Sequence, residues 1–322
     1  MQDARSLPAS GEQHEIGDGA GRAIVTEVGA TLRRYAVDGV DVIDGFTTNE
    51  PSPAGRGQIL APWPNRLDHG TYAFEGHDGR AALDEPEHRN AIHGLVRWLP
   101  WSVTSRADDS ITLACILHPQ PGYPWRLELE VTYALGPGGL TVRPHATNRS
   151  PGTAPFGIGF HPYLTVGVPI EEATLTVPAT KRLLTDPRGL PVGDVPVERT
   201  EFDFTTPRTI GGTRLDTGYT DLVRGADGRV VASVSAPEGR DVSLWVDEAF
   251  GYLMVYTGDT LEPVERRRLG IAIEPMTCPP NAFASGAEVI RLGSGESWTG
   301  SWGISPQAPP GPASSTSATA VT

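Results

Sequence analysis

The sequence of 322 residues has only two cysteines, Cys115 and Cys278, and their positions do not match the spacing of a metal site. Two cysteines cannot form a disulfide framework, so we expect two reduced, buried thiols in a cytoplasmic protein. No stretch of about 18 apolar residues occurs, and the first residues lack the apolar segment of a signal peptide. We therefore expect a cytoplasmic protein without a membrane partner.

Basic residues are also in short supply. The chain has 26 Lys and Arg against 39 Asp and Glu, which gives a formal net charge of −13 at pH 7. An acidic protein repels the phosphates of nucleic acids, and no DNA- or RNA-binding motif is present. We therefore expect no nucleic-acid partner.

Glycine (38 residues) and proline (30 residues) are abundant, but they separate short apolar runs and do not form low-complexity tracts. This distribution predicts a globular body. Residues 305–322 have no apolar periodicity, and we expect them to form a disordered tail. Residues 1–10 are expected to be a flexible N-terminus. No break in composition divides the remainder, so residues 11–304 are predicted to form one domain.

Apolar residues recur at every second position in several segments. In residues 127–135 they alternate with polar residues or alanine, and the alternation resumes after the Gly-Pro-Gly-Gly sequence at 136–139. This pattern predicts a β-hairpin with one buried face. Residues 230–234 and 242–246 alternate in the same way. Asp-Gly pairs predict further turns at 38–39, 78–79 and 227–228.

No segment has the periodicity of an amphipathic helix of three or more turns. Many short strands, separated by turns every 8–12 residues or so, are typical of a sandwich. We therefore predict an all-β fold, built as one large antiparallel β-sandwich.

Four polar phrases interrupt the strand pattern, at residues 61–66, 90–95, 159–164 and 271–281. Each places a chargeable side chain among apolar residues stiffened by glycine or proline, where desolvation shifts pKa values toward catalytic use. A fixed imidazole facing a fixed carboxylate can move protons in both directions near neutral pH. The other histidines lack the His-x-His or His-x-x-x-His spacing of a zinc site, so we expect no metal.

Each of these residues also has a purely structural interpretation. A single histidine in an apolar run, such as His161 or His93, is more often a satisfied core residue than a catalyst. Arg66 could cap a strand or pair with a surface carboxylate. Glu274 is harder to explain structurally, because a carboxylate after the apolar run Ile-Ala-Ile needs a partner or a function.

Four tryptophans accompany the polar phrases and also allow two interpretations. They could be ordinary core residues, or they could offer a flat apolar face to the stacked C–H groups of a sugar ring. The four are Trp63, Trp98, Trp101 and Trp125.

Taken together, the four phrases resemble the aldose 1-epimerase (galactose mutarotase-like) family. The resemblance extends from about Gly29 to about Trp302. It implies a β-supersandwich fold and a cytosolic enzyme that interconverts the α and β anomers of a free aldose without a cofactor. Its anchors are Pro64-Asn65-Arg66, Ile92-His93-Gly94, Gly159-Phe160-His161-Pro162-Tyr163, and Glu274-Pro275 followed by Pro280-Asn281-Ala282.

The resemblance also implies roles for single residues. Glu274 matches the general base of the family and His161 matches its general acid. Arg66 and His93 match residues that hold the sugar and stabilise its ring oxygen, and Asn65 and Trp63 accompany them as substrate-binding candidates. The sugar-binding aspartate is assigned to Asp221. At this point the chain departs from the family, because Leu-Val-Arg follows where an aromatic residue is usual.

The chemistry can also be derived from the groups themselves. An anomer inverts only if its ring opens, which removes a proton from the C1 hydroxyl and adds one to the ring oxygen. Glu274 could accept the first proton and His161 could supply the second, each transfer contributing a factor of about 10²–10⁴. A bell-shaped pH dependence follows, with its acidic limb set by Glu274 and its basic limb by His161.

Three alternative functions remain open. A glycoside hydrolase or lyase would pair Asp221 with Glu274 across a glycosidic bond. A non-catalytic sugar-binding module would need neither His161 nor Glu274 for chemistry. An epimerase for a phosphorylated hexose would need further basic side chains, for which Arg97 and Arg56 are candidates. The expected partner is a small sugar, and the sequence leaves a monomer and a homodimer equally open.

Overall fold

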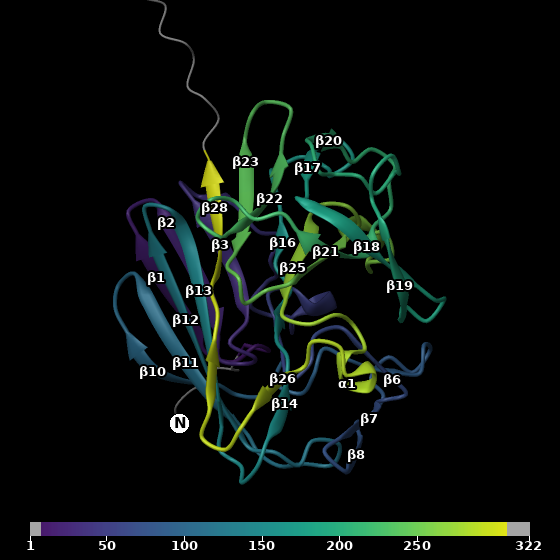
Figure 1. Cartoon of the computed structure of the whole chain (residues 1–322). Helices are drawn as coiled ribbons and strands as arrows, with labels where there is room; N and C mark the ends of the chain where they lie inside the picture. The colour runs from purple at the N-terminus through teal and green to yellow at the C-terminus, as the bar shows by residue number, and fades with distance from the viewer. Residues whose placement is uncertain (1–7, 308–322) are drawn as a thin grey trace, which may run out of the picture.

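The computed structural model describes residues 8–307. This part of the chain contains 28 strands and only three short helices: η1 (Pro53–Gly55), η2 (Val264–Arg266) and α1 (Ala282–Ser285). None of these helices has the length and apolar character needed to cross a membrane. The prediction of an all-β, antiparallel sandwich is confirmed, and Figure 1 shows its strands surrounding a common interior.

The largest sheet has ten strands, which pair antiparallel. The C-terminal strand β28 lies inside this sheet, between β13 and β23, while β27 pairs with β13 at the side of the path. In spatial order the strands are β10 (Ser102–Arg106), β11 (Ser110–Leu117), β12 (Leu127–Gly136), β13 (Gly139–Asn148) with β27 (Ser297–Thr299), β28 (Trp302–Gln307), β23 (Asp241–Val246), β22 (Val230–Ser235), β17 (Thr174–Thr176) and β20 (Arg208–Thr209).

A second sheet has eight strands and carries two of the four polar phrases, those at 159–164 and 271–281. Its strands also pair antiparallel, and β16 pairs with β25 at the side of the path. In spatial order they are β19 (Pro191–Pro196), β18 (Ala179–Thr185), β21 (Asp216–Leu222), β24 (Tyr252–Tyr256), β25 (Ile271–Met276) with β16 (Tyr163–Leu164), β15 (Gly159–Phe160) and β5 (Ile59–Leu60).

Four smaller sheets complete the fold. The N-terminal one has four strands, which lie beside β10–β13 in Figure 1, and three further pairs lie toward the end of the molecule that holds α1. Their strands are β1 (Gln13–Asp18), β2 (Gly21–Thr26), β3 (Leu32–Val37) and β4 (Val40–Asp41), then β6 (Arg66–Asp68) with β9 (Asn90–Ile92), β7 (Thr71–Phe74) with β8 (His77–Arg80), and β14 (Ala154–Phe156) with β26 (Ile290–Leu292).

The hairpin predicted around residues 127–142 is confirmed as β12 and β13, whose register runs from Leu127↔Asn148 to Gly136↔Gly139. The apolar residues at alternate positions of β12 are buried and the residues between them are partly exposed. Each such buried side chain stabilises the fold by about 1.5–3 kcal/mol relative to an exposed one. Gly139 closes the turn with φ +99°, where a Cβ would lie 2.2 Å from the carbonyl oxygen of Ile304.

Two of the three predicted Asp-Gly turns are confirmed, at Asp38-Gly39 and Asp227-Gly228, and the alternating segments at 230–234 and 242–246 form the paired strands β22 and β23. The third prediction is wrong, because residues 78–79 lie within β8. Gly79 faces Tyr72 across the β7–β8 pair, and a Cβ there would lie 2.2 Å from the Tyr72 ring. This glycine makes room for an aromatic ring and does not form a turn.

The structure changes the boundaries of the two ends predicted to be flexible, residues 1–10 and 305–322. Residues 305–307, predicted to begin a disordered tail, complete β28 by pairing with residues 241–243 of β23. Backbone pairing with β23 holds these three residues in the sheet, and such pairing does not depend on a periodic pattern of apolar side chains. Ser10 is buried, and its carbonyl accepts a hydrogen bond from Val28. The rest of the two predicted termini, residues 1–7 and 308–322, lies outside the described residues.

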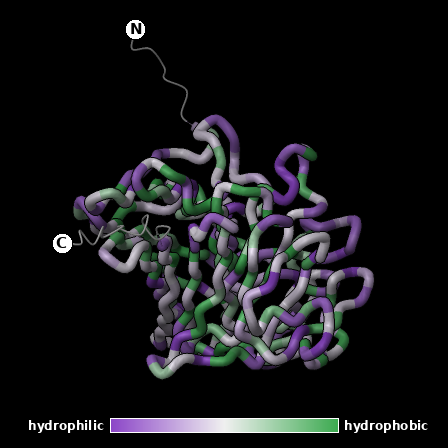
Figure 2. Tube along the Cα trace, turned by 90° about the horizontal axis from the view of Figure 1, so that it is seen from above, coloured by the Kyte–Doolittle hydropathy of each residue, from purple (hydrophilic) through white to green (hydrophobic). Residues whose placement is uncertain are grey.

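One cluster of buried apolar side chains extends from Ile16 to Ile304 and includes members of both large sheets, such as Leu129 and Ile273. Figure 2 shows the hydrophobic segments toward the middle of the molecule and the hydrophilic ones mostly in its outer loops. This shared core fixes β25, β15 and β16 against the rest of the fold, and these strands carry the strongest candidates for a functional site.

Candidate active site

A cleft of about 550 Å³ is lined in part by strands of the eight-stranded sheet. Small-molecule sites typically enclose about 300–1,000 Å³. Residues far apart in sequence line it, from β6, β9, the segment after β15, β21 and β25. Five of the seven predicted site residues are among them: Asn65, Arg66, His93, His161 and Glu274.

Glu274 and His161 meet inside this cleft. His161 Nε2 lies 3.4 Å from Glu274 Oε1, and the two residues are only 5% and 2% exposed. Glu274 projects from β25, in the middle of the sheet, between β24 and β15. The backbone of His161 is held by Gln58, whose carbonyl accepts its N–H at 3.1 Å, and by Gly57, whose N–H donates to its carbonyl at 2.9 Å.

The imidazole of His161 is confined on two sides. The Tyr163 ring stacks on it, with centroids 5.1 Å apart and an angle of 11° between the planes. Gly55 approaches it so closely that a Cβ would lie 2.8 Å from His161 Cδ2, and its φ of +75° also favours glycine. The orientation of the imidazole is therefore set by packing before any ligand binds.

Burial shifts the proton affinities of the pair in opposite directions. Burial, reinforced by the charge of Asp216 and opposed by that of Arg66, raises the pKa of Glu274 well above its ordinary value. Burial lowers the pKa of His161 to about 3, and the charges of Arg56 and Arg97 add to the shift. Both shifts disfavour the charged form of the group, and the two groups lie close enough to titrate as a pair.

Three buried polar atoms of the cleft have no hydrogen-bond partner among residues 8–307: His93 Nδ1, His161 Nδ1 and Glu274 Oε2. A buried polar atom without a partner costs about 1–3 kcal/mol, so folded proteins rarely keep several together. Three such atoms in one cleft indicate a site whose side chains are directed at a polar ligand.

Arg66 is fixed in the cleft wall by carboxylates. Its Nε and Nη2 donate to Glu85 at 3.0–3.1 Å, and its Nη1 lies 3.6 Å from Asp216 Oδ2. Glu85 is held in turn by the amide of Asn90 at 2.9 Å. Burial by itself lowers the pKa of Arg66, but the Glu85 hydrogen bond and the charges of Asp216, Glu85 and Glu274 outweigh it and raise the pKa. Arg66 is therefore a permanent, rigidly placed cation.

Asn65 and His93 flank the paired strands β6 and β9, next to Arg66. Both adopt the left-handed region, with φ of +54° and +63°, and the His93 N–H donates to the Asn65 carbonyl at 2.9 Å. Such conformations cost non-glycine residues about 1–3 kcal/mol and concentrate at functional sites. The His93 ring meets that of His161 edge-on at 5.4 Å. Burial, aided by the charge of His161, lowers the pKa of His93, which keeps its imidazole neutral.

The structure does not place Asp221 in the cleft, contrary to the expectation that it lies with the other site residues. Asp221 lies near the end of β21, half exposed, with its Oδ2 3.2 Å from Lys181 Nζ. Asp216, at the start of the same strand, lines the cleft beside Arg66. Both aspartates lie on β21, and the folded strand brings only its first residue to the cleft.

Trp63 is also outside the cleft. It is 2% exposed and packs in the core against Phe283, with ring centroids 5.5 Å apart. The tryptophan that lines the cleft is Trp98, which is 51% exposed. Sequence could not separate the two, because both occur in phrases rich in proline and apolar residues.

Sequence reasoning also missed Glu85 and Tyr256, which line the cleft. Glu85 reaches Arg66 because its loop folds back on itself, with Glu85 and Asn90 exchanging backbone hydrogen bonds. Tyr256 closes the opposite wall, where its hydroxyl lies 2.8 Å from that of Thr260. No local signal predicts either placement, since both depend on tertiary contacts.

The structure resembles solved structures of aldose epimerases across nearly its whole length. A GalM/aldose epimerase homologue from C. elegans matches with a TM-score of 0.82 at 19% identity, covering 92% of this chain and 98% of that chain. Galactose 1-epimerase from Lactobacillus acidophilus NCFM matches with a TM-score of 0.76 at 21% identity, covering 92% and 95%. At these identities the likeness shows the shared fold.

Sequence relatives carry the comparison further. YihR of Escherichia coli (strain K12), an uncharacterized protein, is 31% identical over 294 residues, covering 90% of this chain and 92% of its own. Galactose mutarotase of Sus scrofa is 28% identical over 166 residues, which is 48% of this chain and 46% of that protein. The family model for aldose 1-epimerase matches residues 12–305. With this match over nearly all of the described residues, the chain belongs to the aldose 1-epimerase family.

Proposed function

We propose that this protein is an aldose 1-epimerase that interconverts the α and β anomers of a free aldohexose by opening and reclosing the sugar ring. The observation that carries the proposal is the His161–Glu274 pair, 3.4 Å apart and buried in a cleft where both side chains keep a polar atom without a partner among the described residues. A carboxylate and an imidazole that share one proton are the groups that this reaction needs.

The reaction is balanced without any other reagent. Glu274 accepts the proton of the C1 hydroxyl, and His161 donates a proton to the ring oxygen as the bond between C1 and that oxygen breaks. Rotation about C1–C2 then turns the aldehyde, and the C5 hydroxyl attacks its other face. His161 recovers a proton from that hydroxyl while Glu274 returns its proton to the C1 oxygen. The two side chains end as they began.

The pair can start this cycle although burial disfavours both charges. Glu274 protonated with His161 neutral holds the same number of protons as Glu274 ionised with His161 protonated. One proton moved between Nε2 and Oε1 converts one form to the other. Arg66 favours the ionised carboxylate and the negative charge that develops on sugar oxygens, because it is a fixed cation in the same cleft.

The remaining polar groups of the cleft are suited to holding a sugar. His93, kept neutral by burial, can donate or accept a single hydrogen bond without adding charge. Asp216 can accept bonds from sugar hydroxyls beside Arg66. Trp98 offers an exposed ring at the cleft, where stacked C–H groups of a hexose can pack.

The phosphorylated-hexose alternative has weaker support. Arg56 does not line the cleft, and its side chain is 2% exposed and bound to Asp44. Arg97 does line it but is paired with Asp84. The hydrolase alternative loses Asp221, which lies outside the cleft, while Asp216, which does line the cleft, lies 3.6 Å from Arg66 Nη1. A free sugar fits the available groups best.

The test is polarimetry on freshly dissolved α-D-glucose and α-D-galactose. We expect the purified protein to speed the approach to anomeric equilibrium and Glu274→Gln to lose nearly all of this acceleration. Glu130→Gln, a change of the same kind on β12 and away from the cleft, serves as the matched control. A folded wild-type protein that accelerates neither these sugars nor their 6-phosphates, yet binds them, would overturn the proposal in favour of a binding module.

A further inference from the structure

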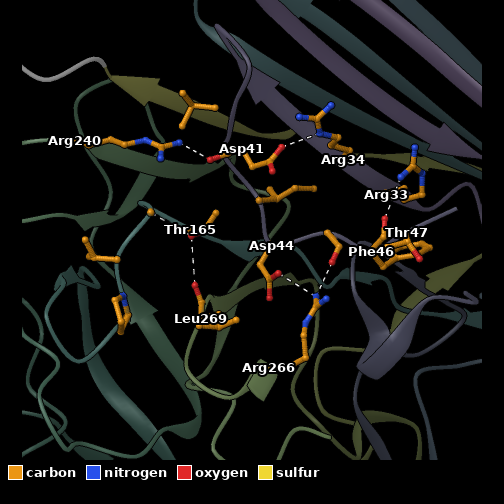
Figure 3. A pocket seen from close by; sticks show the side chains of 16 residues that line it. Arg33, Arg34, Asp41, Asp44, Phe46, Thr47, Thr165, Arg240, Arg266 and Leu269 are labelled. Carbon is orange, nitrogen blue, oxygen red and sulfur yellow. Dashed lines mark hydrogen bonds and ion pairs between the residues drawn. The ribbon is translucent and has the colours of Figure 1, made fainter. Parts of the chain in front are cut away.

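A second cleft, of about 760 Å³, shares no lining residue with the first, and Figure 3 shows its interior. Its charged lining consists of Arg33, Arg34, Asp41, Asp44, Arg240 and Arg266. Most of these side chains are bound to one another or to backbone carbonyls, as the dashed lines show. Asp44 is also bound by Arg56, an arginine that lines neither cleft.

Asp44 is bound by two arginines at once. Arg266 Nη2, on the side of the second cleft, lies 3.0 Å from Asp44 Oδ1. Arg56 Nη2, on the other side, lies 2.9 Å from Asp44 Oδ2. The Arg56 side chain is 2% exposed, and among the described residues Asp44 is its only carboxylate partner. Asp44 therefore neutralises a buried cation that lines neither cleft.

Arg56 contacts Tyr163, a residue that lines the catalytic cleft. The guanidinium carbon of Arg56 lies 4.4 Å from the centroid of the Tyr163 ring, over its face. The same ring stacks on His161. Asp44 is also tied to this residue through the backbone, because its N–H donates to the Tyr163 carbonyl at 2.8 Å. The tyrosine hydroxyl donates to the Ala54 carbonyl at 3.2 Å, so the ring is held at several points.

We infer that Asp44 and Arg56 are positioning residues for the His161–Glu274 pair, acting through Tyr163, and that Asp44 sets how much of the Arg56 charge the pair experiences. The inference rests on the proposed function for its kinetic test. Neither residue lines the cleft that contains His161 and Glu274. Their effect is therefore exerted on the orientation and the proton affinity of His161 and not on the sugar.

Several charged or titratable groups surround His161, and the test has to separate them. Glu274 faces it from β25, His93 from the turn after β9, and Tyr163 from β16. The positive charges that lower its pKa come from Arg56 and Arg97. Of these two, only Arg56 is reached through Tyr163 and bound to Asp44, while Arg97 is bound to Asp84.

The direction of each effect follows from charge. Removing a positive charge near the pair makes every protonation easier, so Arg56→Met should move both limbs of the pH–rate profile to higher pH. Removing the carboxylate leaves Arg56 uncompensated, so Asp44→Asn should move both limbs to lower pH. Shifts of about half a unit to one unit are expected for a partly compensated charge at this range. The double variant should return both limbs close to the wild-type positions.

A matched control lies in the same cleft. Asp41→Asn makes the same chemical change to a carboxylate that pairs with Arg34 and has no contact with Arg56 or Tyr163 among the described residues. It should leave both limbs in place. Asp44→Glu should restore most of the wild-type profile. Thermal melts of every variant establish that the folded proteins are being compared.

The outcomes are distinct. Opposite shifts of the two single variants, cancelled in the double variant, support the inference. Shifts of the same sign, or lower rates with unmoved limbs, overturn it, because a purely structural role would produce them. If the wild-type protein accelerates no sugar, the proposed function fails on its own. The same variants then decide the inference by NMR, through the pH dependence of the His161 ring ¹⁵N and Glu274 carboxyl ¹³C shifts.

Discussion

His161 and Glu274 approach to 3.4 Å with no other charged side chain within hydrogen-bond distance of either among the described residues. Burial is the largest cause of the pKa shift of each group. Two interacting groups lose their protons in steps that belong to the pair. This relationship determines how activity should depend on pH.

The pH–rate profile should be a broad bell. Burial lowers the pKa of His161 to about 3 and raises that of Glu274. The pair gains a second proton only well below the ordinary histidine value of about 6.5 and loses its last one only well above the ordinary glutamate value of about 4.3. We expect kcat/KM to stay level through neutral pH when measured by polarimetry. A half-maximal point near pH 6.5 on the acidic side would contradict this. The broad bell differs from the sequence-based expectation, which assigned the acidic limb to Glu274 and the basic limb to His161.

Glu274→Gln should raise the thermal stability of the protein while removing its activity. Because the folded-state pKa of Glu274 is raised, the unfolded chain releases this proton above about pH 4.3 while the folded protein keeps it. The unfolded state then binds fewer protons, so this group's contribution to the unfolding free energy falls as pH rises. The variant should have a higher melting temperature than the wild-type protein at pH 7.5, and the difference should become smaller toward pH 4. An equal or lower melting temperature at pH 7.5 would argue against a penalised carboxylate.

Asp216→Asn should weaken catalysis and Asp221→Asn should not. Asp216 lines the cleft beside Arg66, while Asp221 pairs with Lys181 outside it. Loss of one charge-assisted hydrogen bond, about 1.5–3 kcal/mol, corresponds to a fall of about 10- to 100-fold in kcat/KM. Both changes lie on β21, so each serves as the other's control. Equal effects would show that the strand, and not the carboxylate, matters.

Trp98→Ala and Trp63→Ala should separate binding from stability. Trp98 is exposed at the cleft, so its loss should raise KM and leave the melting temperature nearly unchanged. Trp63 is buried against Phe283, and truncation of such a residue costs about 3–5 kcal/mol of stability. Kinetics and denaturant unfolding of the two variants are the measurements. The assignment fails if Trp98→Ala leaves KM unchanged.

Gly55→Ala should slow the reaction by displacing His161. The added methyl would lie 2.8 Å from His161 Cδ2, and a displacement of about 1 Å can cost about 100-fold in rate. Gly39→Ala is the control, because it has nearly the same φ, +76° against +75°, but nothing within 4 Å of its Cβ position. Both variants share the backbone strain. Only the first should lose kcat, as measured at saturating sugar.

Local patterns predicted the strands well and the cleft in part. The β12–β13 hairpin follows from alternation in a single segment, which burial of one face enforces. The exchange of Asp216 for Asp221 arose because both lie on one strand, and only the tertiary fold decides which end reaches the cleft. Glu85 could not be predicted, since its partner Arg66 is 19 residues away in sequence and meets it through the folding of a loop.

The position of β28 bears on the order in which the sheet can form. Residues 302–304 pair with β13 on one side, and residues 302–307 pair with β23 on the other. The two halves of the ten-stranded sheet are thus made much earlier during synthesis and are joined only by a segment that leaves the ribosome after them. Pairing over such long sequence separations is slow. Until residues 302–307 emerge, β13 and β23 each keep an unpaired edge, which is the kind of surface that chaperones protect.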